Sequence, residues 1–298
     1  MKKFHAALSL CLASVLLLGC AVAATADNCA PVAQNMEICT YRGVAVSGRL
    51  AATDPEGESL SFEITTPPIK GEISLGEDGS FTYTPAQGKK GKDYFGYKAV
   101  DTDGNSSHEA TVIIRIQKQN SKISYSDMEN NGAHYGAVRL AEEEIFIGEC
   151  LGGRYIFHPE ETVSRGEFLA MCMKLADSEL LTGVQRTGFA DDSDIAQWLR
   201  PYVSTALLSG AISGESTDSG AVFAPGRPIS GAEAAVMLDH VLGLQNVSHM
   251  NQDGSVPVWA EQSVMNLSSS RILTYGEAAS ESLTRAEAAE ILLRAMDK

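Results

Sequence analysis

Three short stretches decide the fold of the C-terminal half: Val163-Ser164-Arg165-Gly166-Glu167, Ile229-Ser230-Gly231-Ala232-Glu233 and Leu283-Thr284-Arg285-Ala286-Glu287. Their middle residues are 66 and 54 positions apart, so the chain contains an internal repeat. In each stretch an apolar residue precedes a Ser or Thr, and a Glu follows three positions later, which is the pattern of a capping box. Apolar residues then recur at helical spacing, so each stretch predicts the start of a helix. The predicted helix-capping residues are Ser164, Glu167, Ser230, Glu233, Thr284 and Glu287.

A second helix is predicted upstream of each of these starts. It opens at an aromatic residue, which is Tyr135, Trp198 or Trp259, and these are 63 and 61 positions apart. Loops that contain Gly and Pro separate the two helices, with Phe157-His158-Pro159 in the first copy and Phe223-Ala224-Pro225 in the second. Each repeat is therefore predicted to be a pair of helices joined by a loop.

The first two copies also open with an aromatic-x-Asp motif, Tyr125-Ser126-Asp127 and Phe189-Ala190-Asp191, whose Asp is expected to cap the first helix or its preceding turn. This order of motifs resembles the S-layer-homology (SLH) module, with copies at residues 121–182, 186–245 and 247–298. The resemblance implies an all-α bundle with pseudo-threefold symmetry whose grooves bind wall polysaccharide. The implied partner is a secondary cell-wall polysaccharide, commonly pyruvylated, or modified peptidoglycan.

Two of the copies depart from the family pattern. The second has Gly231 where the pattern has Arg, and the third is short after Tyr275 and lacks the Phe-x-Pro loop motif. We therefore expect two working grooves, centred on Arg165 and Arg285.

Capping leaves these two arginines unexplained, because a cation in the first turn of a helix opposes the helix dipole. A guanidinium beside free backbone amides would make an anion site suited to a carboxylate such as a pyruvyl ketal. The resemblance gives Arg165 and Arg285 the same ligand-contacting role. The alternative is a solvated arginine, or one paired with a neighbouring acid.

The aromatic residues at the helix starts also have two interpretations. Tyr135, Trp198 and Trp259 could stack on sugar rings, since an aromatic face suits the C–H face of a pyranose. They could equally be core residues, and that interpretation is favoured on sequence alone.

The N-terminal half reads as an antiparallel β domain from residue 31 to residue 116. Short runs rich in Val, Ile, Thr, Tyr and Phe alternate with turn clusters such as Asp54-Pro55-Glu56-Gly57. Their order and spacing predict an immunoglobulin-like (Ig-like) sandwich. The predicted strands are Val44–Leu50, Leu60–Thr65, Gly71–Leu75, Ser80–Thr84, Asp93–Val100 and Ala110–Ile116.

Three motifs of this half, Ala52–Gly57, Asp78–Pro85 and Asp93–Tyr97, resemble the bacterial Ig-like or cadherin-like modules of surface proteins. The resemblance places such a domain at residues 28–118 and implies a spacer, display or adhesive role. The whole chain is thus expected to be multidomain, an all-β sandwich followed by an all-α bundle.

One loop of the sandwich is a candidate calcium site. Asp101, Asp103 and Asn105 have the spacing of oxygens in calcium loops, but Val112 stands where an EF-hand has its bidentate Glu. Asp, Gly and Asn are also what a β-turn requires, and the turn is favoured. We therefore expect no cofactor and no metal.

The N-terminus is expected to be an export signal over residues 1–26. Lys2 and Lys3 precede an apolar run that is short for a membrane helix, and polar residues follow. Ala24-Thr25-Ala26 fits a signal-peptidase site, whereas Leu17-Leu18-Gly19-Cys20 resembles a lipobox. The mature chain is expected to be secreted to the cell wall or S-layer surface, with no transmembrane segment.

Charge excludes one class of partner, and cysteine counting leaves several pairings open. The net charge is −15, and it becomes −17 without Lys2 and Lys3, so nucleic acid is not expected to bind. Cys29, Cys39, Cys150 and Cys172 remain after signal removal. The simplest disulfides are local, Cys29 with Cys39 and Cys150 with Cys172; other pairings and free buried thiols stay open.

Motifs of catalysis are missing from the sequence, which has no HExxH, no Gly-x-Ser-x-Gly and no phosphate-binding glycine loop. We therefore expect a non-catalytic surface protein that is held on the wall by its repeats. The alternatives are a wall-attached enzyme or an accessory subunit of one, and a wall-binding lipoprotein tethered through Cys20.

Overall fold

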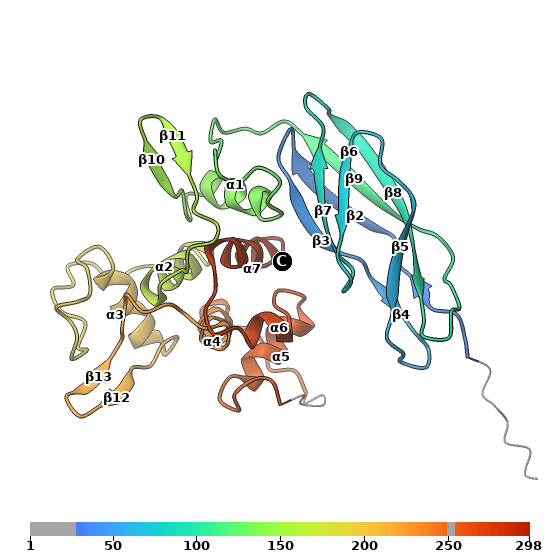
Figure 1. Cartoon of the computed structure of the whole chain (residues 1–298). Coiled ribbons are helices and arrows are strands. Elements are labelled where there is room, and N and C mark those ends of the chain that lie inside the picture. The colour runs from blue at the N-terminus through green and yellow to red at the C-terminus, as the bar shows by residue number, and fades with distance from the viewer. Residues whose placement is uncertain (1–27, 249–253) are drawn as a thin grey trace, which may run out of the picture.

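The computed structural model describes residues 28–248 and 254–298, which form a β-sandwich joined to a helical half (Figure 1). The predicted export signal, both cleavage sites and Cys20 lie outside the described residues. In the part of the chain that is described, no helix is both long and apolar enough to cross a bilayer.

The sandwich consists of a four-stranded sheet and a three-stranded sheet. Its core lies between them and contains Tyr83, Phe95, Tyr97, Val112 and Ile114, all fully buried. Inward and outward side chains alternate along the strands, as a sandwich requires. The first sheet has the order β2 (Met36–Tyr41), β9 (Ala110–Gln117), β8 (Gly91–Val100), β5 (Ser61–Thr66); the second has the order β3 (Val46–Arg49), β7 (Ser80–Pro85), β6 (Gly71–Leu75). A short pair, β1 (Val32–Ala33) and β4 (Ala52–Thr53), closes one end.

All six predicted strands are present, but the sequence pattern does not predict the short β1 and β4 or the longer β2. Strand β2 pairs with β9 in parallel, with Met36 opposite Val112, whereas every other pair in the sandwich is antiparallel. Its partner is more than seventy positions away, so no local turn signal announces it.

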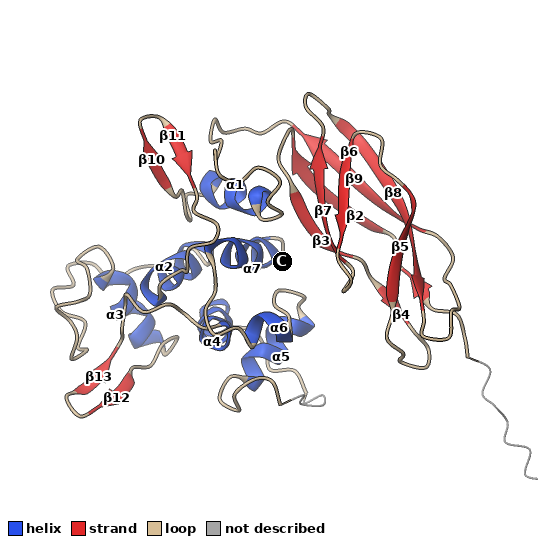
Figure 2. Ribbon diagram, in the orientation of Figure 1, coloured by secondary structure: helices blue, strands red, loops and turns tan. Residues whose placement is uncertain are grey.

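In the described residues, each repeat of the helical half has two main helices. Figure 2 shows these helices in blue. The three predicted capping boxes are confirmed: Ser164, Ser230 and Thr284 each accept from the backbone N–H of the Glu three positions later, and that Glu accepts in return. The helices are α1 (His134–Glu142), α2 (Arg165–Leu175), α3 (Arg200–Ser209), α4 (Gly231–Leu242), α5 (Glu261–Ser269), the short α6 (Tyr275–Ala278) and α7 (Arg285–Met296).

The expectation of an all-α second half is wrong in one respect, because the first two repeats each contain a β-hairpin. These hairpins are β10 (Glu149–Leu151) with β11 (Arg154–Ile156), and β12 (Glu215–Thr217) with β13 (Gly220–Val222). Gly152 and Gly153 both have positive φ, the backbone that a two-residue hairpin turn needs. The Gly-rich loops between the helices are therefore ordered hairpins.

The three repeats close on one another through their helix starts. Val163 N–H donates to Leu283 O (3.0 Å), Leu283 N–H donates to Ile229 O (2.9 Å), and Ile229 N–H donates to Val163 O (3.1 Å). The helices follow the same cycle, since α3 packs on α2, α5 on α4, and α1 on α7. We call these three hydrogen bonds the closure ring.

The predicted disulfides are absent, because Cys39, Cys150 and Cys172 are free thiols in the described part of the chain. Cys172 is completely buried in α2, whereas Cys150 is exposed on β10, so this pair points into different surroundings. Burial raises the pKa of the Cys172 thiol, as expected for an inert core cysteine.

Candidate functional site

Arg165 stands at the first position of α2, directly after the capping residue Ser164. Its side chain is buried and crosses to the second repeat, where Nε donates to Phe223 O (3.0 Å) and Nη1 pairs with Glu233 Oε1 (2.9 Å). The guanidinium carbon also lies 5.4 Å from the centre of the Phe223 ring. The arginine of one repeat is therefore held by the loop and capping Glu of the next.

Glu233 is the centre of this cluster. It accepts from Ser230 N–H in its own capping box, and from Arg227 Nη1 (3.1 Å) and Nη2 (2.5 Å) as well as from Arg165. Burial alone would raise the pKa of Glu233, but the Arg227 hydrogen bonds, the Ser230 amide and the Arg165 charge together lower it. Glu233 is thus a carboxylate that serves the helix start and the arginine at once.

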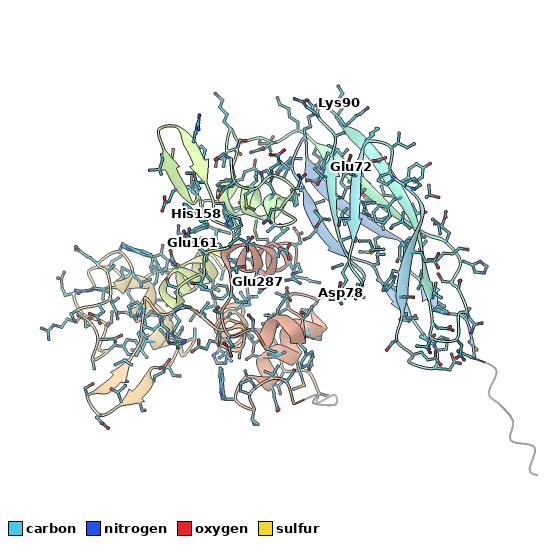
Figure 3. All side chains as sticks on the ribbon, viewed as in Figure 1. Glu72, Asp78, Lys90, His158, Glu161 and Glu287 are labelled. Carbon is cyan, nitrogen blue, oxygen red and sulfur yellow. The ribbon has the colours of Figure 1, made fainter. Side chains whose placement is uncertain are left out.

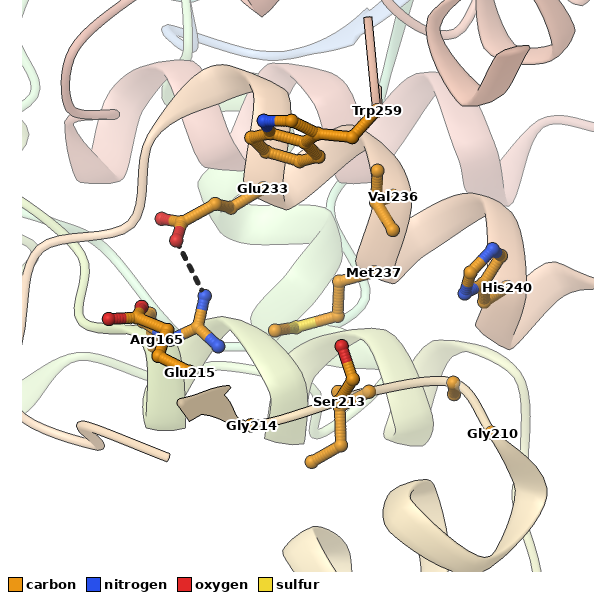
Figure 4. Close-up of a pocket in the computed structure, with 12 residues that line it drawn as sticks. Arg165, Gly210, Ser213, Gly214, Glu215, Glu233, Val236, Met237, His240 and Trp259 are labelled. Carbon is orange, nitrogen blue, oxygen red and sulfur yellow. Dashed lines mark hydrogen bonds and ion pairs between the residues drawn. The ribbon is translucent and has the colours of Figure 1, made fainter. Parts of the chain in front are cut away.

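A pocket of about 250 Å³ opens beside this cluster (Figure 4). Val236, Met237 and His240 of α4 line one wall, and Trp259 of the third repeat stands at its edge. Trp259 is 61% exposed, so a large part of its indole is open to solvent. Helix starts of the first two repeats and the tryptophan of the third therefore build one groove, which we call the Arg165 groove.

Arg285 has the corresponding position at the start of α7 and reaches into the first repeat. Its Nη1 lies 3.1 Å from Glu161 and 3.4 Å from Phe157 O, and its Nη2 lies 3.7 Å from Glu167. Glu287 lies in the first turn of α7, and Glu161 O accepts from Arg285 N–H; both glutamates are labelled in Figure 3. Nε of Arg285 is buried and has no hydrogen-bond partner among the described residues, so this guanidinium is less fully satisfied than that of Arg165.

Both arginines are thus paired with acids, which is the alternative interpretation given above. Burial lowers the pKa of Arg165, and the charge of Glu233 acts in the opposite direction. The structure does not test contact with carbohydrate, which stays a prediction. An incoming carboxylate would have to share these guanidinium groups with Glu233, or with Glu161 and Glu167.

The predicted aromatic residues divide into two groups. Trp198 and Trp259 are 57% and 61% exposed, so the favoured core interpretation is wrong for them. Tyr135 is buried, and its ring packs edge-on against Tyr41 of the sandwich with the centroids 5.1 Å apart. The prediction that Tyr135 could stack on sugar is therefore corrected, because its ring offers no open face.

The helix starts also correct the alignment of the three repeats. Each tryptophan comes immediately before the N-cap residue of its helix, Leu199 or Ala260. In the first repeat the N-cap is Ala133, so Gly132 is the counterpart of Trp198 and Trp259. Tyr135 is three positions further along, inside α1.

Asp127 and Asp191 do not cap the first helix of their repeats. Asp127 accepts from Phe157 N–H (2.9 Å) and His158 N–H (2.7 Å), and Asp191 makes the same bonds to Phe223 (2.9 Å) and Ala224 (2.7 Å). They fix the Phe-x-Pro loops whose Phe carbonyls hold the two arginines.

The candidate calcium loop is a turn stabilised by its own side chain. Asp101 accepts from the backbone N–H groups of Asp103 and Asn105, and these bonds together with the Asn105 amide outweigh burial and lower the pKa of Asp101. Within residues 28–248 and 254–298, no group of three His, Cys, Asp or Glu side chains is placed to hold a metal ion.

The capping-box pattern predicts Glu233 and Glu167 only as capping residues and does not reveal their pairing with arginines. Glu161 and Arg227, which complete the two clusters, are not predicted by any motif. A signal existed, because the Phe-x-Pro loop precedes each of the two relevant capping boxes by a fixed short interval. The long-range partner itself could not be read from that interval.

Two family models match parts of the chain. The family model for the bacterial cadherin-like domain matches residues 28–118, and that for the S-layer homology domain matches residues 188–235. The chain thus combines a β-sandwich module with a helical half that contains one stretch matched by the S-layer homology model. In particular, the chain carries a bacterial cadherin-like domain followed by S-layer homology sequence, so cell-wall anchoring of a surface protein is supported.

Solved structures share only small parts with this chain. An endo-fucoidan hydrolase of glycoside hydrolase family 107 is 20% identical over 32% of this chain and 14% of that one (TM-score 0.26). The SrpA adhesin of Streptococcus sanguinis is 20% identical over 34% and 62% (TM-score 0.26), and an intimin D00-D0 fragment 14% identical over 31% and 50% (TM-score 0.25). The chain thus spans less than two thirds of each. A search of curated proteins found no match.

Proposed function

We propose that this is a secreted, non-catalytic protein that binds a secondary cell-wall polysaccharide in grooves between its repeats. The cadherin-like sandwich is displayed on the wall by this attachment. The export signal over residues 1–26 delivers the chain to that location.

In this proposal the three repeats form a pseudo-threefold bundle. The closure ring supports it, because Val163, Ile229 and Leu283 each donate to one neighbour and accept from the other. The same cycle relates Arg165 to the Phe223 carbonyl and Arg285 to the Phe157 carbonyl. Grooves then recur wherever one repeat presents its arginine to the next.

One observation carries the proposal: an exposed tryptophan stands at the edge of a pocket that also contains a charged arginine and glutamate pair (Figure 4). An indole face suits the C–H face of a pyranose ring. A guanidinium donates hydrogen bonds and a carboxylate accepts them, which matches the hydroxyl groups of a sugar. The Arg165 groove therefore offers both kinds of contact that a glycan requires.

The second working groove is centred on Arg285, with Trp198 as the counterpart of Trp259. Trp198 comes immediately before Leu199, the N-cap residue of α3. Helix α3 packs on α2, and the Leu199 side chain lies against Gly166, the residue before Glu167. Because Arg285 is less fully satisfied than Arg165, we propose that it takes the anionic group of the polymer, a pyruvyl ketal carboxylate. Two grooves on one chain would also strengthen binding to a repetitive polymer through avidity.

Co-sedimentation with purified cell walls tests this function. The Trp198→Ala/Trp259→Ala variant should bind at least about tenfold more weakly, since one aromatic anchor is removed from each groove. The matched control is Leu151→Ala/Leu208→Ala, which removes two exposed apolar side chains that do not line the Arg165 groove, and it should bind like the parent. A tryptophan variant that sediments like the parent would overturn the proposal.

The identity of the glycan is tested in the same assay with walls from which the secondary polymer has been stripped chemically. Loss of binding is expected. Binding that survives would replace the polymer with modified peptidoglycan as the ligand. Walls that retain the polymer but lack its pyruvyl groups test the ketal, and undiminished binding would remove it from the proposal.

The non-catalytic role and the mode of export need separate measurements. Prolonged incubation with walls should release no soluble fragments, whereas release would favour the alternative of a wall-attached enzyme.

Mass spectrometry of the mature N-terminus should find cleavage after Ala26. A lipid on Cys20 would instead show a tethered lipoprotein.

A further inference from the structure

The third inter-repeat groove lacks both residues that mark the other two. In the cycle of repeats this groove lies against the face of α7, and it is bordered by the start of α4 and the start of α1. Gly231 takes the position of Arg165 and Arg285, and Gly132 takes the position of Trp198 and Trp259. In both positions the structure explains why a side chain is absent.

At Gly231 the space is filled by the third repeat. A Cβ atom there would lie 1.9 Å from Glu277 O, and Gly231 N–H donates to Ser280 O. The short helix α6 thus lies where an arginine side chain would start. Any residue larger than Gly would collide with backbone rather than with a flexible side chain.

At Gly132 the space is filled by the cadherin-like domain. Gly132 O accepts from Ser47 N–H (3.0 Å), and a Cβ atom at Gly132 would lie 2.9 Å from Ser47 Cβ and 3.1 Å from Thr82 Oγ1. Strand β3 therefore lies where the other two repeats have an exposed indole.

Further hydrogen bonds join the sandwich to α1 and α7. Tyr135 N–H donates to Ala45 O (3.0 Å), and Tyr41 OH donates to Glu142 (2.7 Å). Ser47 Oγ donates to Glu290 (2.7 Å), which lies on the face of α7 at the position equivalent to Val236 of the Arg165 groove. The sandwich thus contacts α1 and α7, two of the three helices that border the third groove.

What remains of this groove is a cleft of about 760 Å³ between the sandwich and the third repeat. Arg49 and Asp78 line it from the sandwich, and Glu277, Glu290 and Arg294 line it from the helices. Figure 3 shows Asp78 on the side of the sandwich that faces the helical half. No tryptophan borders it.

We propose that the cadherin-like domain is the built-in occupant of the third groove. It is docked there by β3 and the Tyr41 hydroxyl, so it keeps one orientation relative to the repeats and is not a freely swinging spacer. The chain consequently presents two glycan grooves, a number that rests on the proposed function, whereas the docking does not.

The full-length Gly132→Trp variant tests the docking, because an indole at this position and β3 cannot share the same space. Gly226→Trp is the matched control, since Gly226 is exposed, has an ordinary φ and has nothing within 4 Å of its Cβ position. Small-angle scattering should give a larger radius of gyration for Gly132→Trp only. Hydrogen exchange at Ser47 and Tyr135 should accelerate at least about tenfold, while the amides of the closure ring stay protected.

A second variant, Ser47→Trp, makes the same steric conflict from the sandwich side and should behave like Gly132→Trp if the latter folds poorly. Two results would overturn the proposal: a parent chain whose scattering requires two independently moving domains, or variants with undiminished protection at Tyr135. Calorimetry with the purified wall polymer should count two sites in both the parent and Gly132→Trp. Three sites in the parent would also overturn the docking proposal. If the polymer does not bind at all, the proposed function is wrong, and the docking is then tested by hydrogen exchange alone.

Discussion

The Arg165 groove and the third groove are built from equivalent elements, but different residues and segments occupy them. Both begin at a capping box, both lie against the second helix of a repeat, and both join the closure ring. One holds Arg165 and Trp259, and the other has Gly231 and Gly132, with α6 and β3 in their place. The comparison shows that other parts of the same chain occupy the positions of the arginine and the tryptophan in the third groove, so one framework serves two different uses.

The largest effect is expected from restoring the missing arginine. Gly231→Arg should destabilise the protein by more than about 4 kcal/mol, because its Cβ would collide with the backbone of Glu277. Chemical denaturation measures this loss. Gly226→Arg places the same side chain at an open position and should be nearly neutral, so similar stability of the two variants would show that α6 can move aside.

Removal of the buried arginine should cost less. Arg165→Ala leaves the Phe223 carbonyl without its donor and removes a buried partner of Glu233, so a loss of about 3 kcal/mol is expected. Arg285 pairs with the exposed Glu161, and Arg285→Ala should cost only about 1 kcal/mol. Equal losses of unfolding free energy for the two variants, in thermal or chemical unfolding, would contradict the conclusion that Arg165 is held more fully than Arg285.

The capping boxes should be equivalent in all three repeats. Ser164→Ala, Ser230→Ala and Thr284→Ala should each lower the free energy of unfolding by about 1 kcal/mol, whether the groove is open or filled. A much larger cost at Ser230 alone would show that the filled groove depends on its cap in a different way.

The smallest effect concerns Glu290 at the docked interface. Burial raises its pKa, while Ser47 and Arg294 lower it less and Glu277 and Glu287 add to the rise. A carboxyl with a raised folded-state pKa stabilises the fold below its ordinary pKa, and that contribution is lost as the pH rises through the raised value. Glu290→Gln should therefore increase stability at pH 7 and have no advantage below about pH 4.5. A gain that persists in acid would exclude ionisation as its cause.

Local signals explain which features could be predicted from the sequence. Capping boxes, the turn at Asp101 and six strands depend on neighbouring residues and were found. The partners of Arg165 are 58 and 68 positions away, and β2 pairs with β9, which is distant in the sequence. No local pattern therefore reveals these pairings. Tyr135 is matched with the tryptophans because it is an aromatic residue near the predicted helix start, whereas its true counterpart, Gly132, has no side chain that a motif could reveal.

The closure ring has a consequence for the order of folding. A linear array of repeats can start folding at any unit and extend stepwise. Here Val163 needs both Ile229 and Leu283, and Leu283 is synthesised 120 residues after Val163. Contacts of such long sequence separation form slowly. The first repeat therefore stays unfinished until the third has been made, and a nascent or truncated chain that lacks the third repeat leaves the helix starts of the other two unsealed.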